Sequence, residues 1–194
     1  MSEWDDTWFF SNPAERIELE RTYVDTNVVD KSGFKILDVG GKDFHQHFQS
    51  TPTIYTMIDI DTPLVTGTGG YNAHPEGQLF DGKLLPFVED DFDAIIMGYM
   101  LHHAADTSLQ LLKQAKHISS KHILVFEDLT SIHYPQSWLN RNHSHQPGGM
   151  FRSDNEWRLI FELFGFMLHR SIRLKRKDDL DENTYRAFYH LLVE

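Results

Sequence analysis

Short hydrophobic runs recur along the chain, and segments with the periodicity of amphipathic helices separate them. Four apolar runs have the length and composition of strands that a parallel sheet buries on both faces, namely Lys35–Val39, Ile54–Ile58, Phe92–Met97 and His122–Phe126. Gln78–Phe80 is a weaker strand candidate between the second and third of these runs. The pattern predicts strands that alternate with helices.

Three helices are predicted from caps and apolar stripes. The first follows SNPAER, where Ser11 or Asn12 can cap and Pro13 suits the first helical position, and it should run to about Val29. In TSLQLLKQAKHI the apolar side chains share one stripe, namely Leu111, Leu112, Ala115 and Ile118. In SDNEW, Ser153 and Glu156 have the spacing of a capping box, and Gly165 is placed to end that helix.

After the third helix, apolar positions from Phe166 to Leu174 follow a period of two, and a last strand covers roughly Tyr185–Val193. This closing pair has no helix between its strands, so it should be antiparallel. The whole pattern predicts an α/β fold with a Rossmann-like, doubly wound, mostly parallel sheet of seven strands and an antiparallel C-terminal strand.

Composition supports one domain over residues 1–194, because 40% of the residues are hydrophobic and can bury a sizeable core. No run approaches the roughly 20 apolar residues of a membrane helix. The MSEWDDTWFF start lacks the basic flank of a secretion signal. With no cysteine, disulfides and thiolate metal sites are excluded. We therefore expect a cytoplasmic protein without a membrane partner.

Charge disfavours a nucleic-acid partner, because a net charge of −11 repels phosphates overall. The basic run RSIRLKRK, residues 170–177, is interpreted as the exposed face of an edge strand. The aromatic residues near the N-terminus, Trp4, Trp8, Phe9 and Phe10, have two interpretations. They could belong to an N-terminal helical lid, residues 1–30, or anchor the first helix against the sheet.

Polar residues stand where the first two strands end. In doubly wound sheets, ligands bind beyond the carboxyl ends of the strands, where the strand order reverses. ILDVGGKDF supplies Asp38, followed by Gly40 and Gly41, which lack Cβ atoms and let the backbone approach a ligand. Asp59 follows about 20 positions later, where a carboxylate can accept hydrogen bonds from ribose hydroxyls. A plain turn and a capping aspartate are the alternatives.

Two longer segments resemble a known family. LLPFVEDDFDAIIMGYMLHHA is similar to the signature of class I S-adenosylmethionine-dependent methyltransferases, with its Leu-Pro-Phe turn, acidic turn, Phe-Asp, apolar strand and Leu-His-His. FRSDNEWRLIFELFGFMLHR resembles the late helix and strand of the same family. The resemblance spans about Lys35 to Arg170 and implies a Rossmann-like methyltransferase with S-adenosyl-L-methionine as cofactor.

By matching position, the resemblance implies roles for individual residues. Asp38 would lie near the methionine amino group, Asp59 would hold the ribose hydroxyls, and Asp81 would bind the adenine amino group. The full set of implied cofactor-binding residues is Asp38, Gly40, Gly41, Asp59, Ile60, Asp81, Gly82, Met97 and Gly98. Lys42 and Phe44 stand where the family's first motif usually has further glycines, and the first crossover helix must be short, about Asp43–Gln49.

The acceptor is expected near a long irregular stretch, residues 127–152, which leaves the same edge of the sheet and is interpreted as a substrate loop. Methyl transfer needs in-line alignment and exclusion of water, and it needs a base only for a hydroxyl or a protonated amine. The candidate catalytic residues are His103, Glu127 and His133. His143 and His145 alone do not make a metal site, so no metal is expected.

The sequence therefore predicts a methyltransferase that modifies an O, N or C atom of a small molecule. Two alternatives remain: a methyltransferase-like protein that binds the cofactor or a partner without turnover, and an RNA methyltransferase, which the basic run RSIRLKRK keeps open. A nicotinamide dehydrogenase is disfavoured, because the three-glycine spacing of that class is missing.

Overall fold

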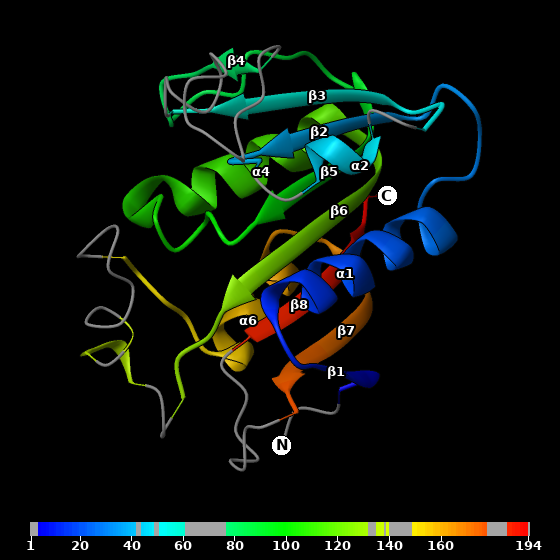
Figure 1. Ribbon diagram of the computed structural model, residues 1–194. Helices are drawn as coiled ribbons and strands as arrows, with labels where there is room; N and C mark the ends of the chain where they lie inside the picture. The colour runs from blue at the N-terminus through cyan, green and yellow to red at the C-terminus, as the bar shows by residue number, and fades with distance from the viewer. Residues whose placement is uncertain are drawn as a thin grey trace.

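The apolar runs pair into one continuous sheet, and helices cover both of its faces (Figure 1). The structure is a computed structural model. It describes residues 4–41, 44–48, 51–60, 77–131, 135–137, 139, 149–177 and 186–193, except the side chains of residues 45 and 46. Within these residues, no helix is both long and apolar enough to cross a membrane.

The sheet has eight strands in the order β1-β7-β8-β6-β5-β2-β3-β4. Their bounds are β1 Asp6–Phe10, β2 Lys35–Val39, β3 Ile54–Asp59, β4 Gln78–Leu79, β5 Phe92–Gly98, β6 Ser119–Asp128, β7 Met167–Arg176 and β8 Arg186–Leu192. Strand β8 pairs antiparallel with both β6 and β7, and the other pairings are parallel. The predicted mostly parallel α/β sheet with an antiparallel C-terminal strand is confirmed.

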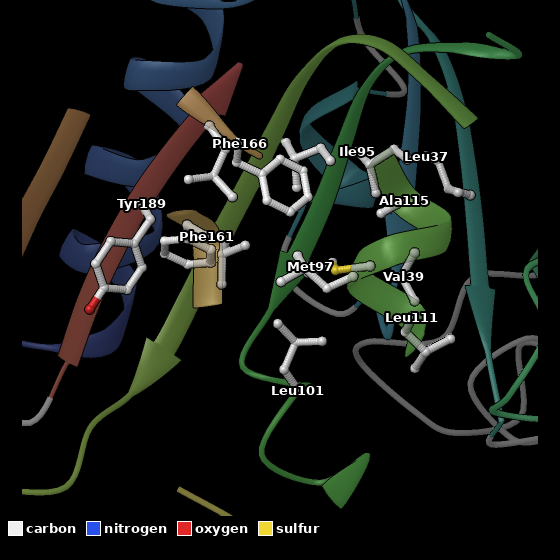
Figure 2. Close-up of a cluster of buried hydrophobic side chains, with 14 of the residues drawn as sticks. Leu37, Val39, Ile95, Met97, Leu101, Leu111, Ala115, Phe161, Phe166 and Tyr189 are labelled. Atoms are coloured by element: carbon white, nitrogen blue, oxygen red, sulfur yellow. The ribbon is translucent and has the colours of Figure 1, made fainter. Parts of the chain in front are cut away.

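The helices divide between the two faces of the sheet. They are α1 Pro13–Asn27, α2 His45–Phe48, α4 Ser108–Ile118 and α6 Asp154–Leu163, with a 3₁₀ turn, η2, over Ala105–Thr107. Because side chains of a strand alternate between faces, β2 sends Leu37 and Val39 to the α4 and α6 side and Ile36 to the α1 and α2 side. Figure 2 shows the first of these two clusters, which extends from α4 across the sheet to Phe161 of α6 and Tyr189 of β8.

The helix ends follow the predicted capping residues. The Asn12 side chain accepts a hydrogen bond from the Glu15 backbone N–H, directly before Pro13. At α6 the Ser153 and Glu156 side chains make the reciprocal pair of a capping box. The first crossover helix is short, as expected, and covers only the four residues of α2.

Three of the four N-terminal aromatic residues pack against the sheet, whereas Phe9 is exposed, and the expected helical lid is wrong for residues 6–10. These residues form β1, an eighth strand that pairs with β7, which is why the sheet exceeds the seven strands predicted. Phe10 is buried, the Trp8 ring lies 5.8 Å from Phe188, and Trp4 stacks on Tyr189 at 6.1 Å. The anchoring interpretation describes these side chains better than a lid does, although β1, rather than the first helix, carries most of them.

The basic run was wrongly interpreted as an edge strand, because β7 lies between β1 and β8. Its cations contact both sides of the sheet. The Arg170 guanidinium lies 5.9 Å from the Tyr23 ring, and that of Arg173 lies 5.5 Å from the Trp4 ring. Lys177 pairs with Glu15. The run therefore contributes local contacts on opposite faces instead of one basic surface.

A hydrogen-bonded relay crosses the interior from α1 to β6. The Tyr23 hydroxyl lies 2.8 Å from His190 Nδ1, and His190 Nε2 lies 2.9 Å from His122 Nδ1. Burial disfavours the charged imidazoles and lowers the pKa of His190 to about 3 and that of His122 to about 4. His169 and Arg170, which face His190 from β7, and Lys121 beside His122 act in the same direction.

The relay predicts that the protein loses stability in mild acid. Folding lowers both histidine pKa values, so the unfolded chain binds more protons, and the stabilisation is complete above about pH 6.5 and declines below it. We expect each histidine to lower the free energy of unfolding by about 2 kcal/mol between pH 7.5 and pH 5, about 4 kcal/mol for the two together. Urea unfolding at the two pH values measures this loss.

The variant His190→Gln can keep hydrogen bonds but does not titrate, so its stability should depend less on pH. His117→Gln, at an exposed position on α4, is the matched control and should behave as the wild type. Equal pH dependence in His190→Gln and the wild type would contradict the role of the relay.

Candidate functional site

The strand order places a switch point between β2 and β5. From β2, the strands β3 and β4 continue toward one edge of the sheet, whereas β5 and β6 lie toward the other. The two central strands are paired in parallel, from Ile36 with Ala94 to Val39 with Met97, so their carboxyl ends are adjacent. This is the position where doubly wound sheets bind ligands.

The turn after β2 is packed too closely for any side chain. Gly40 has φ +71°, and a Cβ on it would lie 2.9 Å from the Met100 Cβ. A Cβ on Gly41 would lie 2.6 Å from both Asp38 Cγ and Met57 Cγ. Packing by itself therefore requires glycine at both positions, whether or not a ligand binds there. This supports the plain-turn alternative.

Asp38 lies beneath this turn and is almost completely buried, with 1% of its surface exposed. The Tyr55 hydroxyl donates a hydrogen bond of 2.5 Å to its Oδ2. Phe44, which replaces a glycine of the family's motif, packs with Phe48 and Phe126 in the cluster on the α1 side. Its ring therefore belongs to the core, and Lys42 lies outside the described residues.

The ends of β3 and β4 bring together the next group of predicted residues. Asp59 closes β3 and is 8% exposed, and its carbonyl accepts a hydrogen bond from the Phe80 N–H. Ile60 is 59% exposed, and a Cβ on Gly82 would lie 3.1 Å from its Cγ2. The Thr107 hydroxyl donates to the Gly82 carbonyl at 3.2 Å, which joins the start of α4 to this turn.

Asp81 stands in the same turn and is exposed. Its Oδ1 accepts hydrogen bonds of 2.8 Å from the N–H groups of both Lys83 and Leu84. These bonds favour the ionised carboxylate and lower the pKa of Asp81. Asp81 therefore stabilises the turn that contains Gly82, close to Ile60.

The end of β5 carries two of the predicted residues, Met97 and Gly98, in different environments. The Met97 side chain is fully buried in the cluster shared with α4 (Figure 2). Gly98 is half-buried, and a Cβ on it would meet no atom of the described residues within 4 Å. Of the predicted pair, Gly98 is therefore the one with open space beside it at the switch point.

Glu127 has a different environment from the one expected of a catalytic base. It is fully buried, its Oε1 accepts from the Leu101 N–H at 2.8 Å, and its Oε2 lies 2.7 Å from His102 Nδ1. Burial alone would lower the pKa of His102, but the Glu127 charge and hydrogen bond raise it overall. Glu127 holds the turn after β5 in place.

His103 is exposed beside this pair, with its ring 4.0 Å from the His102 ring. The segment 149–152, from the predicted substrate loop, also reaches His102: the Met150 N–H donates to the His102 carbonyl at 2.8 Å, and the Phe151 ring stacks at 4.5 Å. Sequence reasoning missed this contact, because no local pattern links the two segments. His133, His143 and His145 lie outside the described residues.

Among the residues that the structure describes, no group of three or more His, Asp or Glu side chains is arranged to hold a metal ion.

No protein-family model and no curated protein sequence matches the chain. Solved structures do share its fold. A Haloferax volcanii methyltransferase bound to the Trm112 methyltransferase activator is 13% identical, with a TM-score of 0.66 over 92% of this chain and 93% of that one. An Aquifex aeolicus SAM-dependent methyltransferase is 17% identical, with a TM-score of 0.60 over 95% of both. The cyclase SpnF is 15% identical, with a TM-score of 0.65 over 87% of this chain and 63% of that one.

The packing of the turn predicts that Gly41→Ala is destabilising. A methyl group 2.6 Å from Asp38 and Met57 forces both side chains to move, and such overpacking costs about 1–3 kcal/mol. Gly98→Ala is the matched control, because its methyl group has open space. Thermal and urea unfolding measure the difference, and equal stability of the two variants would contradict the packing described here.

Proposed function

We propose that this chain, which has the fold of class I S-adenosylmethionine-dependent methyltransferases, binds S-adenosyl-L-methionine and transfers its methyl group to a small-molecule acceptor. One observation carries the proposal. Asp38, Asp59 and Asp81 stand at or just beyond the carboxyl ends of three adjacent parallel strands, beginning with a glycine turn at the switch point. That order of residues is the one that the resemblance implies for an adenosyl cofactor.

The proposed cofactor position runs along the ends of β2, β3 and β4. Asp38 and the Gly40–Gly41 turn would border the methionine end, and Asp59 would accept hydrogen bonds from the ribose hydroxyls. Ile60 and Gly82, which lie so near that a Cβ on Gly82 would be 3.1 Å from Ile60 Cγ2, would border the adenine together with Asp81. A sulfonium methyl donor supplies a group that leaves a neutral thioether behind, so little acid–base assistance is required.

The contribution of the protein would be alignment and shielding from water. His103 is the exposed candidate base on the acceptor side, where a hydroxyl or a protonated amine would need one. Glu127 would act through His102 by fixing the turn that carries His103. Glu127 is thus better described as a positioning residue than as the base itself.

A small-molecule acceptor is favoured over RNA by the distribution of charge. The net charge is −11, and the basic side chains of β7 contact opposite faces of the sheet. RNA recognition relies on cations gathered along one surface to contact phosphates.

Binding without methyl transfer is the second candidate. The cyclase SpnF shares the fold, so the fold alone does not fix the reaction. In addition, Lys42 stands in place of a second glycine in the cofactor loop. Under this alternative the cofactor binds but no acceptor is methylated.

Isothermal titration with S-adenosylmethionine and S-adenosylhomocysteine tests the cofactor. We expect both to bind, and Asp59→Ala should weaken binding by roughly 1.5–3 kcal/mol, about ten- to hundredfold, because hydrogen bonds to a charged group are lost. Asp30→Ala removes an exposed carboxylate paired with Lys121 and is the control that should bind normally. No binding to the wild type would overturn the proposal, and unchanged affinity in Asp59→Ala would overturn the ribose position.

His103 is predicted to affect turnover without affecting the cofactor. For a hydroxyl or amine acceptor, His103→Ala should lower kcat by roughly a hundredfold or more, the usual contribution of a positioned base. Its affinity for S-adenosylhomocysteine should remain that of the wild type. Transfer of a labelled methyl group across an acceptor panel measures turnover, with His117→Ala as control. Normal turnover in His103→Ala would show that His103 is not the base.

A further inference from the structure

Tyr99 has a backbone conformation that bulky residues rarely adopt. It follows directly after β5 and has φ +55°, in the left-handed region, where a side chain with a Cβ is crowded by its own backbone. Its N–H donates to the Phe126 carbonyl at 2.7 Å, so β6 holds this turn from one side. Such an outlier persists only where surrounding contacts enforce it, and it is more common at functional sites.

Contacts from α1 enforce this conformation through the side chain. The Tyr99 hydroxyl donates a hydrogen bond of 2.8 Å to Oε1 of Glu20. The same oxygen accepts from Arg16 Nη1 at 2.7 Å, and Glu20 is fully buried. The guanidinium of Arg16 lies 4.4 Å from the Tyr99 ring centroid, and that of Arg186 lies 5.8 Å from it. The ring is thus fixed at its edge by Glu20 and along its faces by two cations.

The Tyr99 turn determines what lies opposite the glycine turn. The next residue, Met100, is the one whose Cβ would be only 2.9 Å from a Cβ on Gly40. Two left-handed residues, Gly40 and Tyr99, thus follow the paired ends of β2 and β5. Gly98, the last residue of β5, directly precedes Tyr99, and a Cβ on it would meet no atom of the described residues within 4 Å.

We propose that Tyr99 is a positioning residue for the methionine end of the cofactor, and that Glu20 of α1 holds it in place. The inference rests on the proposed function and adds to it a part of the chain, α1, that no motif assigns to the site. Glu20 of the helix holds the side chain of Tyr99 through its hydrogen bond. The left-handed backbone of Tyr99 in turn sets the positions of its neighbours, Gly98 and Met100. Met100 lies next to Gly40 of the glycine turn. The adenosine end, at β3 and β4, is outside this arrangement.

Two ligands separate the effect on the methionine end from a general effect on the fold. S-adenosylhomocysteine carries the amino-acid end, and 5′-methylthioadenosine lacks it while keeping the adenosine. For both Tyr99→Phe and Glu20→Gln, we expect the Kd for S-adenosylhomocysteine to rise roughly five- to twentyfold, because the hydrogen bond that holds the turn is weakened. The Kd for methylthioadenosine should stay within about twofold of the wild type, since its subsite is unchanged.

Tyr23→Phe is the matched control. Like Tyr99→Phe, it removes a phenol hydroxyl. The Tyr23 hydroxyl, however, belongs to α1 and bonds His190 in the interior, not the turn after β5. Both dissociation constants should therefore remain at their wild-type values, although the fold loses a buried hydrogen bond. Thermal unfolding of all variants shows which of them are folded at the titration temperature, and Tyr99→Phe, which leaves the pair of Arg16 and Glu20 intact, keeps the test valid if Glu20→Gln is unstable.

The outcomes are distinguishable. If the wild type binds neither ligand, the proposed cofactor function is wrong and the inference fails with it. If the wild type binds both ligands but the Tyr99→Phe and Glu20→Gln variants weaken both equally, or weaken neither, the cofactor function stands and the positioning role of Tyr99 is wrong. Selective loss of S-adenosylhomocysteine affinity, absent in Tyr23→Phe, supports the inference.

Discussion

The close packing of the turn after β2 is the constraint on which the polar edge of the sheet depends. A Cβ on Gly41 would lie 2.6 Å from both Asp38 Cγ and Met57 Cγ, and a Cβ on Gly40 would lie 2.9 Å from the Met100 Cβ. Whole-domain stability is typically about 5–15 kcal/mol, so the 1–3 kcal/mol that overpacking typically costs is a large fraction of it. Packing alone therefore requires glycine at both positions. As a consequence, the backbone of this turn carries no side chains at the switch point.

Buried carboxylates organise the turns around this point. Glu127 binds backbone N–H of the turn after β5, Glu20 binds the side chain of the same turn, and Asp38 accepts from Tyr55 beneath the glycine turn. Leaving a buried acceptor without its hydrogen-bond partner typically costs about 1–3 kcal/mol, and more for a charged group, because its desolvation is no longer offset. Each buried carboxylate therefore stabilises the conformation of the turn that it bonds. These turns lie at the switch point, where a reaction would need precise geometry.

Helix α1 connects the interior of the fold with the proposed site. One turn apart on this helix, Glu20 contacts Tyr99 at the carboxyl edge, whereas Tyr23 contacts His190 in the relay that leads to His122. A helix of this length is marginal on its own in water, so tertiary contacts keep it in place. The helix is therefore both a cover for the sheet and a support for the turn after β5.

The sequence by itself determined the strands, the capped helices and the order of acidic residues along the edge, because apolar periodicity, caps and turns are local properties of the chain. It did not reveal that residues 6–10 form an edge strand on β7, nor that Phe151 stacks on His102. It also gave no indication of the bond between Glu20 and Tyr99, which are 79 positions apart. Such contacts depend on which distant segments meet, and so does the burial of Glu127, a candidate base, against the Leu101 N–H and His102. Only the tertiary structure decides these environments, since a side chain's partners and its exposure to water follow from the packing of the whole sheet.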